Sequence, residues 1–248
     1  MTIKEIQQAL IRNGYPIVAD GISGAKTKAA IIDFQKKNGL DADGIVGPKT
    51  IAKLQGDLNT NKINIFISAG HHSKALTSPD TGAIGVDGLK EGDVTIEFRD
   101  LVCAELDRMG IKYIKDRDLD ETLSQYLKRI ETNSKSIVVE YHCNAFNKKA
   151  TGTEVIIEDE ADKNDVAFAT ELVDMQAKYL RIPNRGVKKE KESARGKLGL
   201  MREEGLVVLP ELIFIDNPVD VQAYNQNKKY LATAHVMIIK KYSELINK

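Results

Sequence analysis

The stretch NIFISAGHHSK, Asn64–Lys74, is an apolar run that stops at Gly70 and is followed directly by two histidines. SIVVEYHCNAF, Ser136–Phe146, is a second apolar run that ends in a histidine. Apolar runs of this length, bounded by polar and turn residues, are typical of strands. The chain has only four histidines, and three of them lie at the ends of these two expected strands.

Apolar runs of the same kind recur in the second part of the chain and alternate with amphipathic helical segments. The expected strands are Ile63–Ile67, Ile137–Val139, Val155–Ile157 and Leu206–Leu209, and the expected helices cover roughly Gly92–Met109, Asp162–Leu180 and Tyr224–Leu245. Alternation of this kind is typical of α/β folds. We therefore expect an α/β domain in which helices cover both faces of a sheet.

An internal repeat marks the first part of the chain. DGISGAKT, Asp20–Thr27, returns as DGIVGPKT, Asp43–Thr50, and each copy runs into a helical pattern. Asp-Gly is a turn signal, because the carboxylate can bond nearby backbone amides and glycine tolerates positive φ. An earlier helical pattern begins with a capping box formed by Thr2 and Glu5 and is closed by Gly14. The sequence therefore predicts three helices before the first apolar strand.

A polar segment, GDLNTNK at residues 56–62, has no hydrophobic periodicity and is typical of a linker. It separates an expected small three-helix domain, residues 1–55, from an expected larger domain, residues 63–248. A three-helix unit of this size buries only a small core, which indicates an accessory domain.

Composition argues against several classes of partner. The chain holds 36 basic and 36 acidic residues, so its charge balance indicates neither nucleic acid nor a membrane surface. No apolar segment approaches the length of a membrane span.

Cys103 and Cys143 are too few for a disulfide framework and are expected to be free thiols. The N-terminal sequence lacks the continuous apolar core of a signal peptide, so we expect a cytoplasmic protein in the producing cell.

Three polar residues occupy positions where ligands gather in open α/β sheets, at the carboxyl ends of strands, and a fourth candidate begins a helix. His71 and His142 follow two expected strands, and Glu211 follows a third that Pro210 is expected to end. Glu91 begins the long helix, where free amides and the helix dipole favour a carboxylate. Two imidazoles and a carboxylate form the ligand set of a catalytic zinc site, and a further carboxylate can serve as proton carrier. On spacing alone, hydrogen-bonded loop histidines are the alternative.

Seven separated stretches occur in the order found in the zinc-dependent N-acetylmuramoyl-L-alanine amidases of the amidase-3 family. They are SAGHHS, GVDGLKEGDVTIEF, KDRDLDETLSQYLKRIETN, VEYHCNAF, GTEVII, NRGVK and VLPELIFIDNPVD. The resemblance covers nearly all of Ile63–Tyr242. DGIVGPKT, with FQKKNGL before it, resembles the peptidoglycan-binding helical module often fused to such enzymes, over Thr2–Leu54.

The resemblance implies that His71, Glu91 and His142 bind zinc and that Glu211 is catalytic, first as base and then as acid. It implies hydrolysis of the amide between the lactyl group of muramic acid and L-alanine of the stem peptide. Bacterial peptidoglycan is then the partner, with no obligate protein partner. We expect a phage or prophage endolysin. The alternatives are a bacterial autolysin or spore-cortex amidase, a non-catalytic wall-binding protein, and a zinc peptidase that acts within the stem peptide.

The chain departs from the family at two positions beside the expected ligands. His72 and Cys143 stand where the family usually has glycine and alanine. Neighbours in extended backbone point to opposite sides, so one of the two adjacent histidines faces the metal, and the resemblance selects His71. Asn144 is a candidate for substrate contact, and His235 lies on the apolar stripe of the last helix and is expected in the core.

Overall fold

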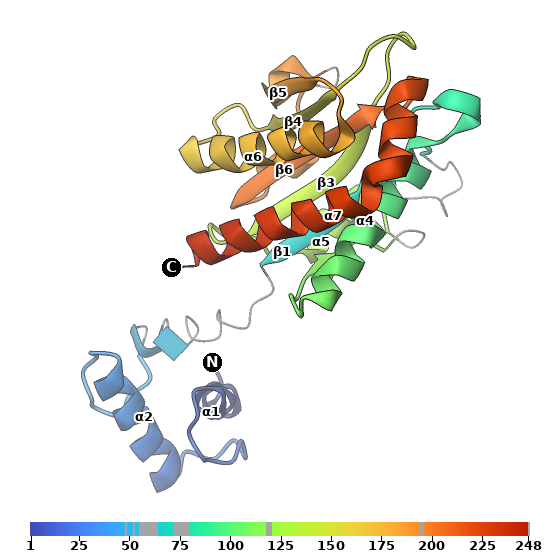
Figure 1. Ribbon diagram of the computed structural model, residues 1–248. Helices are drawn as coiled ribbons and strands as arrows, with labels where there is room; N and C mark the ends of the chain where they lie inside the picture. The colour runs from blue at the N-terminus through green and yellow to red at the C-terminus, as the bar shows by residue number, and fades with distance from the viewer. Residues whose placement is uncertain are drawn as a thin grey trace. The chain divides into compact units, whose positions relative to one another are not determined.

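The computed structural model describes residues 1–47, 49–51, 53–54, 64–71, 80–117, 121–193 and 196–247 (Figure 1). Contacts divide the chain into two units, Met1–Lys62 and Ile63–Lys248. The expected linker and His72 lie outside the described residues, so the domain boundaries at 55 and 63 stay a prediction.

The N-terminal unit contains helices α1 (Ile3–Arg12) and α2 (Ala25–Lys37), and residues 49–51 and 53–54 are also helical. α1 begins with the expected capping box, in which Thr2 and Glu5 each accept a hydrogen bond from the other's backbone amide. The small core of the N-terminal unit is formed by Ile6, Ala9, Leu10, Ala30, Ile31, Phe34 and Leu54.

A buried glutamine organises the first copy of the repeat. Gln7, on α1, donates through Nε2 to Asp20 Oδ1 at 2.8 Å, to the Ile22 carbonyl at 2.9 Å and to Thr27 Oγ1 at 3.1 Å. Its Oε1 accepts from the Gly21 amide at 2.7 Å. The Gln7 side chain therefore holds the turn in place, and the turn supplies the hydrogen-bond partners that a buried amide needs.

The second copy has the same network, centred on Gln35 of α2. Its Nε2 donates to Asp43 at 2.9 Å, to the Ile45 carbonyl at 2.9 Å and to Thr50 at 3.2 Å, and Gly44 N donates to its Oε1 at 2.8 Å. The sequence repeat is thus a repeat of hydrogen bonds, and each turn is locked to the helix that precedes it.

The larger unit is built on a six-stranded sheet with the order β2-β1-β3-β6-β4-β5 (Figure 1). The strands are β1 (Ile65–Ala69), β2 (Ile114–Lys115), β3 (Ile137–Asn144), β4 (Thr153–Ile157), β5 (Asn184–Lys189) and β6 (Leu206–Phe214). All neighbours are parallel except β4 and β6, which are antiparallel. The carboxyl ends of β1, β3 and β6 therefore meet at one edge.

Helices cover both faces of this sheet, as the sequence predicts. α4 (Glu91–Arg108), α6 (Lys163–Leu180) and α7 (Pro218–Ile246) pack on one face and enclose the main core. On the other face, the described residues form α5 (Leu123–Arg129) and a 3-10 turn, Gly199–Arg202, which enclose a smaller core. Two further 3-10 turns, Val86–Gly88 and Glu190–Glu192, lie in loops. We call the second face of the sheet the α5 face.

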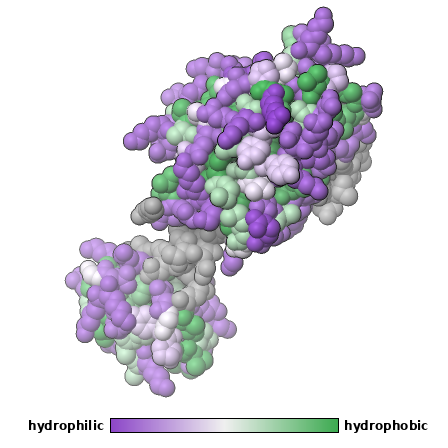
Figure 2. All heavy atoms as spheres, viewed as in Figure 1, coloured by the Kyte–Doolittle hydropathy of each residue, from purple (hydrophilic) through white to green (hydrophobic). Residues whose placement is uncertain are grey.

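The surface of the larger unit is mostly hydrophilic on the side that Figure 2 shows, with apolar side chains in small groups. None of the described helices is long and apolar enough to cross a membrane.

Two boundaries differ from expectation for identifiable reasons. β6 does not end at Pro210 but continues to Phe214. The fixed φ of proline is compatible with an extended strand, so Pro210 does not have to end β6. Proline has no N–H to donate, and the ladder between β3 and β6 has no residue pair at Pro210: it passes from Val139–Val208 to His142–Glu211. α7 begins at Pro218, well before Tyr224, because the Asn217 side chain caps it and proline suits the first helical position.

Candidate metal centre

The polar side chains of the site continue the strand alternation of the α5 face. Apolar residues cover the first part of each strand on this face: Phe66 in β1, Val138 in β3, Val207 and Leu209 in β6, and Ile156 in β4. At even spacing from them follow Ser68, Glu140, His142 and Glu211, with Glu154 two positions before Ile156 on the antiparallel strand. One half of this face is therefore core and the other half is a polar site.

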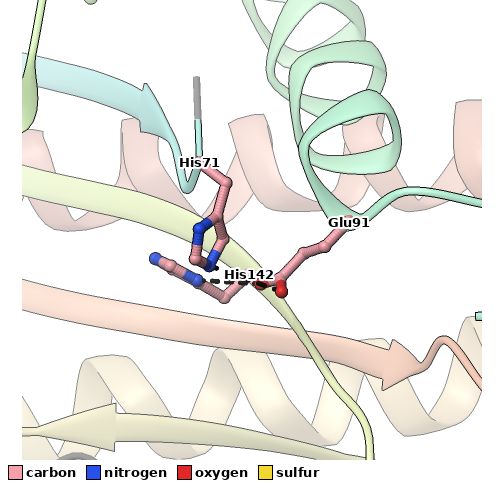
Figure 3. A group of neighbouring side chains, drawn as sticks. All are labelled: His71, Glu91 and His142. Carbon is pink, nitrogen blue, oxygen red and sulfur yellow. Dashed lines mark hydrogen bonds and ion pairs between the residues drawn. The ribbon is translucent and has the colours of Figure 1, made fainter. Parts of the chain in front are cut away.

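Three side chains from different elements meet at the carboxyl edge of the sheet. His71 lies two residues after the end of β1, Glu91 is the first residue of α4, and His142 lies in β3 (Figure 3). One ligand atom from each lies within 4.8 Å of the others. The structure thus brings together the three residues that the resemblance assigns to zinc.

The spacing of these atoms fits a small metal ion. Glu91 Oε1 lies 3.0 Å from His142 Nδ1, and Glu91 Oε2 lies 3.4 Å from His71 Nε2 (Figure 3). Ligand atoms around a tetrahedral zinc, at bonds of about 2.0–2.1 Å, are separated by about 3.3 Å. Two imidazoles and one carboxylate also match zinc's preferred donors, and they leave room for a fourth ligand.

The carboxylate of Glu91 is held by backbone donors as well. Ala83 N donates to Oε2 at 2.9 Å and Cys143 N donates to Oε1 at 3.1 Å. Burial alone raises the pKa of Glu91, but the hydrogen bonds and positive charges of His142 and His71 outweigh it and hold this pKa far below its usual value. Glu91 is therefore ionised and fixed in place.

The backbone around the centre has no space for larger residues. His71 adopts a left-handed conformation with φ of 60°, which is uncommon for a residue other than glycine. A Cβ on Gly70 would lie 2.2 Å from the His142 ring, and a Cβ on Gly82 would lie 2.6 Å from Glu91 Oε2. Strained backbone of this kind persists where surrounding structure enforces it, often at functional sites.

Each histidine also contacts a carboxylate on the side away from Glu91. His142 Nε2 lies 3.0 Å from Glu140 Oε1, and His71 Nδ1 lies 2.8 Å from Asp80 Oδ2. Burial lowers the pKa of His142, but the hydrogen bonds to Glu140 and Glu91 prevail and raise the pKa to about 10. Sequence reasoning missed Glu140, although its position two residues before His142 in a strand puts both on one face.

Glu211 lies beside this centre in β6. It pairs with His142 across the ladder to β3 and with Glu154 across the ladder to β4. A cavity is lined by Ala83, Glu91, His142, Cys143, Asn144, Ala145, Glu154, Ile156, Glu192, Ser193, Leu198, Leu209 and Glu211. The expected catalytic carboxylate and two of the three expected ligands thus line one cavity.

Asn144 contributes an oriented amide to the same cavity. Its Nδ2 donates to Glu154 Oε1 at 2.9 Å, and Glu154 Oε2 accepts from Arg185 Nε at 2.8 Å. Because Glu154 accepts from the amide nitrogen of Asn144, the group that this side chain can offer to a ligand is its oxygen Oδ1, a hydrogen-bond acceptor. The guanidinium of Arg185 lies 4.9 Å from the Phe214 ring centre, which anchors this chain of contacts.

The side chains of Cys143, Cys103 and His235 belong to the main core and not to the group of expected ligands. Cys143 is buried in the main core on the opposite side of β3, and burial raises the pKa of its thiol well above the usual value. Cys103 is also buried with a free thiol. His235 is fully buried in α7, where its Nδ1 lies 3.3 Å from the Tyr141 hydroxyl, and burial lowers its pKa to about 3. It is the core residue that the apolar stripe predicts.

Residues 65–241 match the family described as N-acetylmuramoyl-L-alanine amidase, which is more than half of the chain. The chain belongs to this amidase family. Residues 2–54 match a second family, described as a putative peptidoglycan binding domain. The larger unit is therefore an amidase-family domain, and the segment that matches the putative peptidoglycan binding domain precedes it in the chain.

Individual relatives agree with this assignment. A probable N-acetylmuramoyl-L-alanine amidase of Bacillus licheniformis is 36% identical over 81 residues, which are 32% of this chain. The match spans only 21% of that relative's length.

Solved structures of amidases share the fold of the amidase domain. AmiC2 of Nostoc punctiforme is 24% identical with a TM-score of 0.60, over 73% of this chain and 97% of that one. An amidase from Clostridium difficile 630 is 21% identical with a TM-score of 0.61, over 74% and 98% of the two chains.

Proposed function

We propose that the protein is a zinc-dependent N-acetylmuramoyl-L-alanine amidase, which hydrolyses the amide between N-acetylmuramic acid and L-alanine of the stem peptide. The observation that carries the proposal is the meeting of His71, Glu91 and His142 at hydrogen-bonding distances, with Glu211 opposite His142 in the sheet. Membership of the amidase family supports the choice of substrate.

The residues of the cavity have separable roles in this reaction. His71, Glu91 and His142 would hold zinc, which when bound supplies Lewis acidity that polarises an amide carbonyl and acidifies water. Glu211 takes a proton from the attacking water and returns it to the leaving amine nitrogen of L-alanine. Asn144 orients the peptide by accepting a hydrogen bond from it.

The N-terminal module acts as a tether in this proposal. Its match to a putative peptidoglycan binding domain supports attachment to the wall. Attachment raises the effective concentration of substrate at the amidase domain without any new contact in the cavity. Deletion of residues 1–55 should therefore weaken retention on cell walls more than it slows hydrolysis of soluble muropeptides, and an equal loss in both would contradict the tether.

For the biological setting we propose host lysis by a phage or prophage endolysin, made in the cytoplasm and active on the wall once the membrane opens. A bacterial autolysin or spore-cortex amidase is the alternative. The two differ when the chain is expressed in susceptible cells with and without a membrane-permeabilising protein. Lysis only after permeabilisation supports the endolysin, and wall turnover in intact cells supports the alternative.

Digestion of purified peptidoglycan tests the proposed reaction directly. The wild-type protein should release new L-alanine amino termini and no new reducing ends. A chelator-treated sample and Glu211→Ala should release neither. New amino termini elsewhere in the stem peptide would favour a zinc peptidase, and wall binding by zinc-loaded protein without any cleavage would favour a non-catalytic role.

A further inference from the structure

Glu140 is a buried carboxylate that the reaction outlined above does not use. It lies in β3 on the α5 face and is only 4% exposed. Its Oε1 contacts His142 Nε2 at 3.0 Å, and its Oε2 accepts a hydrogen bond from Ser68 Oγ at 3.2 Å. A buried charge is destabilising unless hydrogen bonds compensate for it. The contacts of Glu140 with His142 and Ser68 provide this compensation, and the contact with His142 suggests a role at the metal centre.

The sheet itself holds Glu140 in place. Ser68 and Glu140 are paired residues in the ladder between β1 and β3, so the two side chains lie side by side on one face. Glu140 and His142 are both buried, and four leucines, Leu123, Leu198, Leu200 and Leu209, line the cavity beside their contact together with His71 and Asp80. A hydrogen bond to a carboxylate is stronger in such surroundings than in water.

Both ring nitrogens of His142 face a carboxylate, Nε2 that of Glu140 and Nδ1 that of Glu91, each at 3.0 Å. A metal ion held by Glu91 would take the place of the proton on Nδ1, whereas Glu140 only accepts hydrogen bonds, so the proton of the neutral ring would stay on Nε2. The other nitrogen, Nδ1, then presents its lone pair on the side of Glu91, 3.0 Å from Glu91 Oε1. That is the side on which His71 Nε2 also lies.

We propose that Glu140 is a positioning residue of the metal centre, which keeps the proton of His142 on Nε2 and thereby directs Nδ1 toward the ion. The inference rests on the zinc centre of the proposed function and goes beyond it. Carboxylates that accept from a ligating histidine fix its ring and raise its basicity, and their loss lowers metal affinity about 10- to 100-fold.

The same site contains a natural control. Asp80 contacts Nδ1 of His71 at 2.8 Å, in the same arrangement relative to Glu91, but its side chain is 63% exposed while that of Glu140 is 5% exposed. Exposed ion pairs contribute little because water screens them. The two carboxylates should therefore differ in effect, although each contacts one histidine.

Zinc affinity, measured by competition with a chromophoric chelator, tests the inference on the full-length protein. We expect Glu140→Ala to weaken zinc binding about 10- to 100-fold. Asp80→Ala should weaken it by less than about fivefold. Glu140→Gln should lie between the wild type and Glu140→Ala, because its amide oxygen still accepts from Nε2–H. In the zinc-loaded wild type, the ¹⁵N shifts of His142 should show protonated Nε2 and metal-bound Nδ1.

The outcomes separate this inference from the proposed function. If Glu140→Ala and Asp80→Ala change zinc affinity equally, or neither changes it, Glu140 does not position His142. Metal bound through Nε2 would also overturn the inference. A merely structural role predicts a lower unfolding temperature of zinc-free Glu140→Ala with unaltered zinc affinity of the folded protein. A wild type without zinc affinity would remove the centre itself, and a wild type that binds zinc but leaves peptidoglycan intact would remove only the amidase.

Discussion

His142 and Glu211 are paired residues in the parallel ladder between β3 and β6. Both side chains lie on the α5 face, at the carboxyl end of their strands, and both line the same cavity. The negative charge of Glu211 is one of the influences that raise the pKa of His142. A substrate bound at the metal centre would therefore lie next to the carboxylate of Glu211, which is not one of the three expected metal ligands.

Glu211→Gln should abolish most of the hydrolysis without removing the metal. An amide of the same shape cannot accept a proton from water, and general acid–base residues contribute roughly 10²- to 10⁴-fold to rate. We expect kcat for release of L-alanine amino termini to fall by that range, while zinc content stays at the wild-type level. Glu204→Gln is the matched control, because Glu204 is an exposed glutamate outside the cavity. Substantial turnover by Glu211→Gln would mean that another group carries the proton.

The zinc-free protein should become less stable as the pH rises above neutrality. Hydrogen bonds to Glu140 and Glu91 raise the folded pKa of His142 to about 10, above an unfolded value of about 6.5. A raised pKa stabilises the fold below the unfolded value, and this stabilisation is lost as pH rises through the folded value. Urea unfolding between pH 7 and 10 should show a decline of at most about 1.4 kcal/mol per pH unit.

Two controls isolate the contribution of His142 to this pH dependence. His142→Asn has no imidazole, so the decline should shrink in its zinc-free form. Zinc-saturated protein should also lack it, because a ligating histidine is held in its neutral form. A decline of the same slope in all three samples would assign it to other groups.

The sequence could place the three residues that meet at this centre because their positions depend on local features, whereas only the family resemblance assigned them to zinc. His71 and His142 follow or end apolar runs, and Glu91 begins a helix whose pattern is clear, so their positions along the chain already place them at one edge of a parallel sheet. The helix that begins at Glu91 was expected from Gly92, one residue away.

What the sequence did not reveal depends on register between strands and on contacts far apart in the chain. The pairing of Glu211 with Glu154 requires β4 to run antiparallel to β6, and no periodicity within either strand contains that information. The charged run Lys188–Ser193 is typical of a solvated loop, yet Lys188 and Lys189 belong to β5, because they pair with β4 through backbone groups that their charged side chains do not affect. Glu140 was open to prediction, since strand alternation places it beside His142.

Asn144→Ala should weaken substrate binding rather than metal binding. Asn144 lines the cavity, and Glu154 accepts from its amide nitrogen, so its side-chain oxygen Oδ1 is the group that we expect to accept from a peptide N–H of the substrate. A single neutral hydrogen bond contributes about 0.5–1.5 kcal/mol, so kcat/KM should fall about 2- to 13-fold, mainly through KM. Asn225→Ala, an exposed asparagine on α7, is the control. An unchanged KM in Asn144→Ala would exclude this contact.

The buried glutamines of the N-terminal module should be equally important for its fold. Gln7 and Gln35 each bond an aspartate, a threonine and two backbone groups of the turn that follows, at nearly the same distances. Replacing either by alanine leaves buried polar groups without a partner, which destabilises by about 1–3 kcal/mol. Hydrogen exchange in residues 1–47 of the full-length protein should accelerate similarly in Gln7→Ala and Gln35→Ala, and retention on purified cell walls should fall in both.

Gln8→Ala is a close control, because Gln8 is the exposed neighbour of Gln7 on the same helix. Hydrolysis of soluble muropeptides should stay at the wild-type rate in all three variants, and a loss of that activity in Gln7→Ala or Gln35→Ala would show that the module does more than hold the enzyme on the wall.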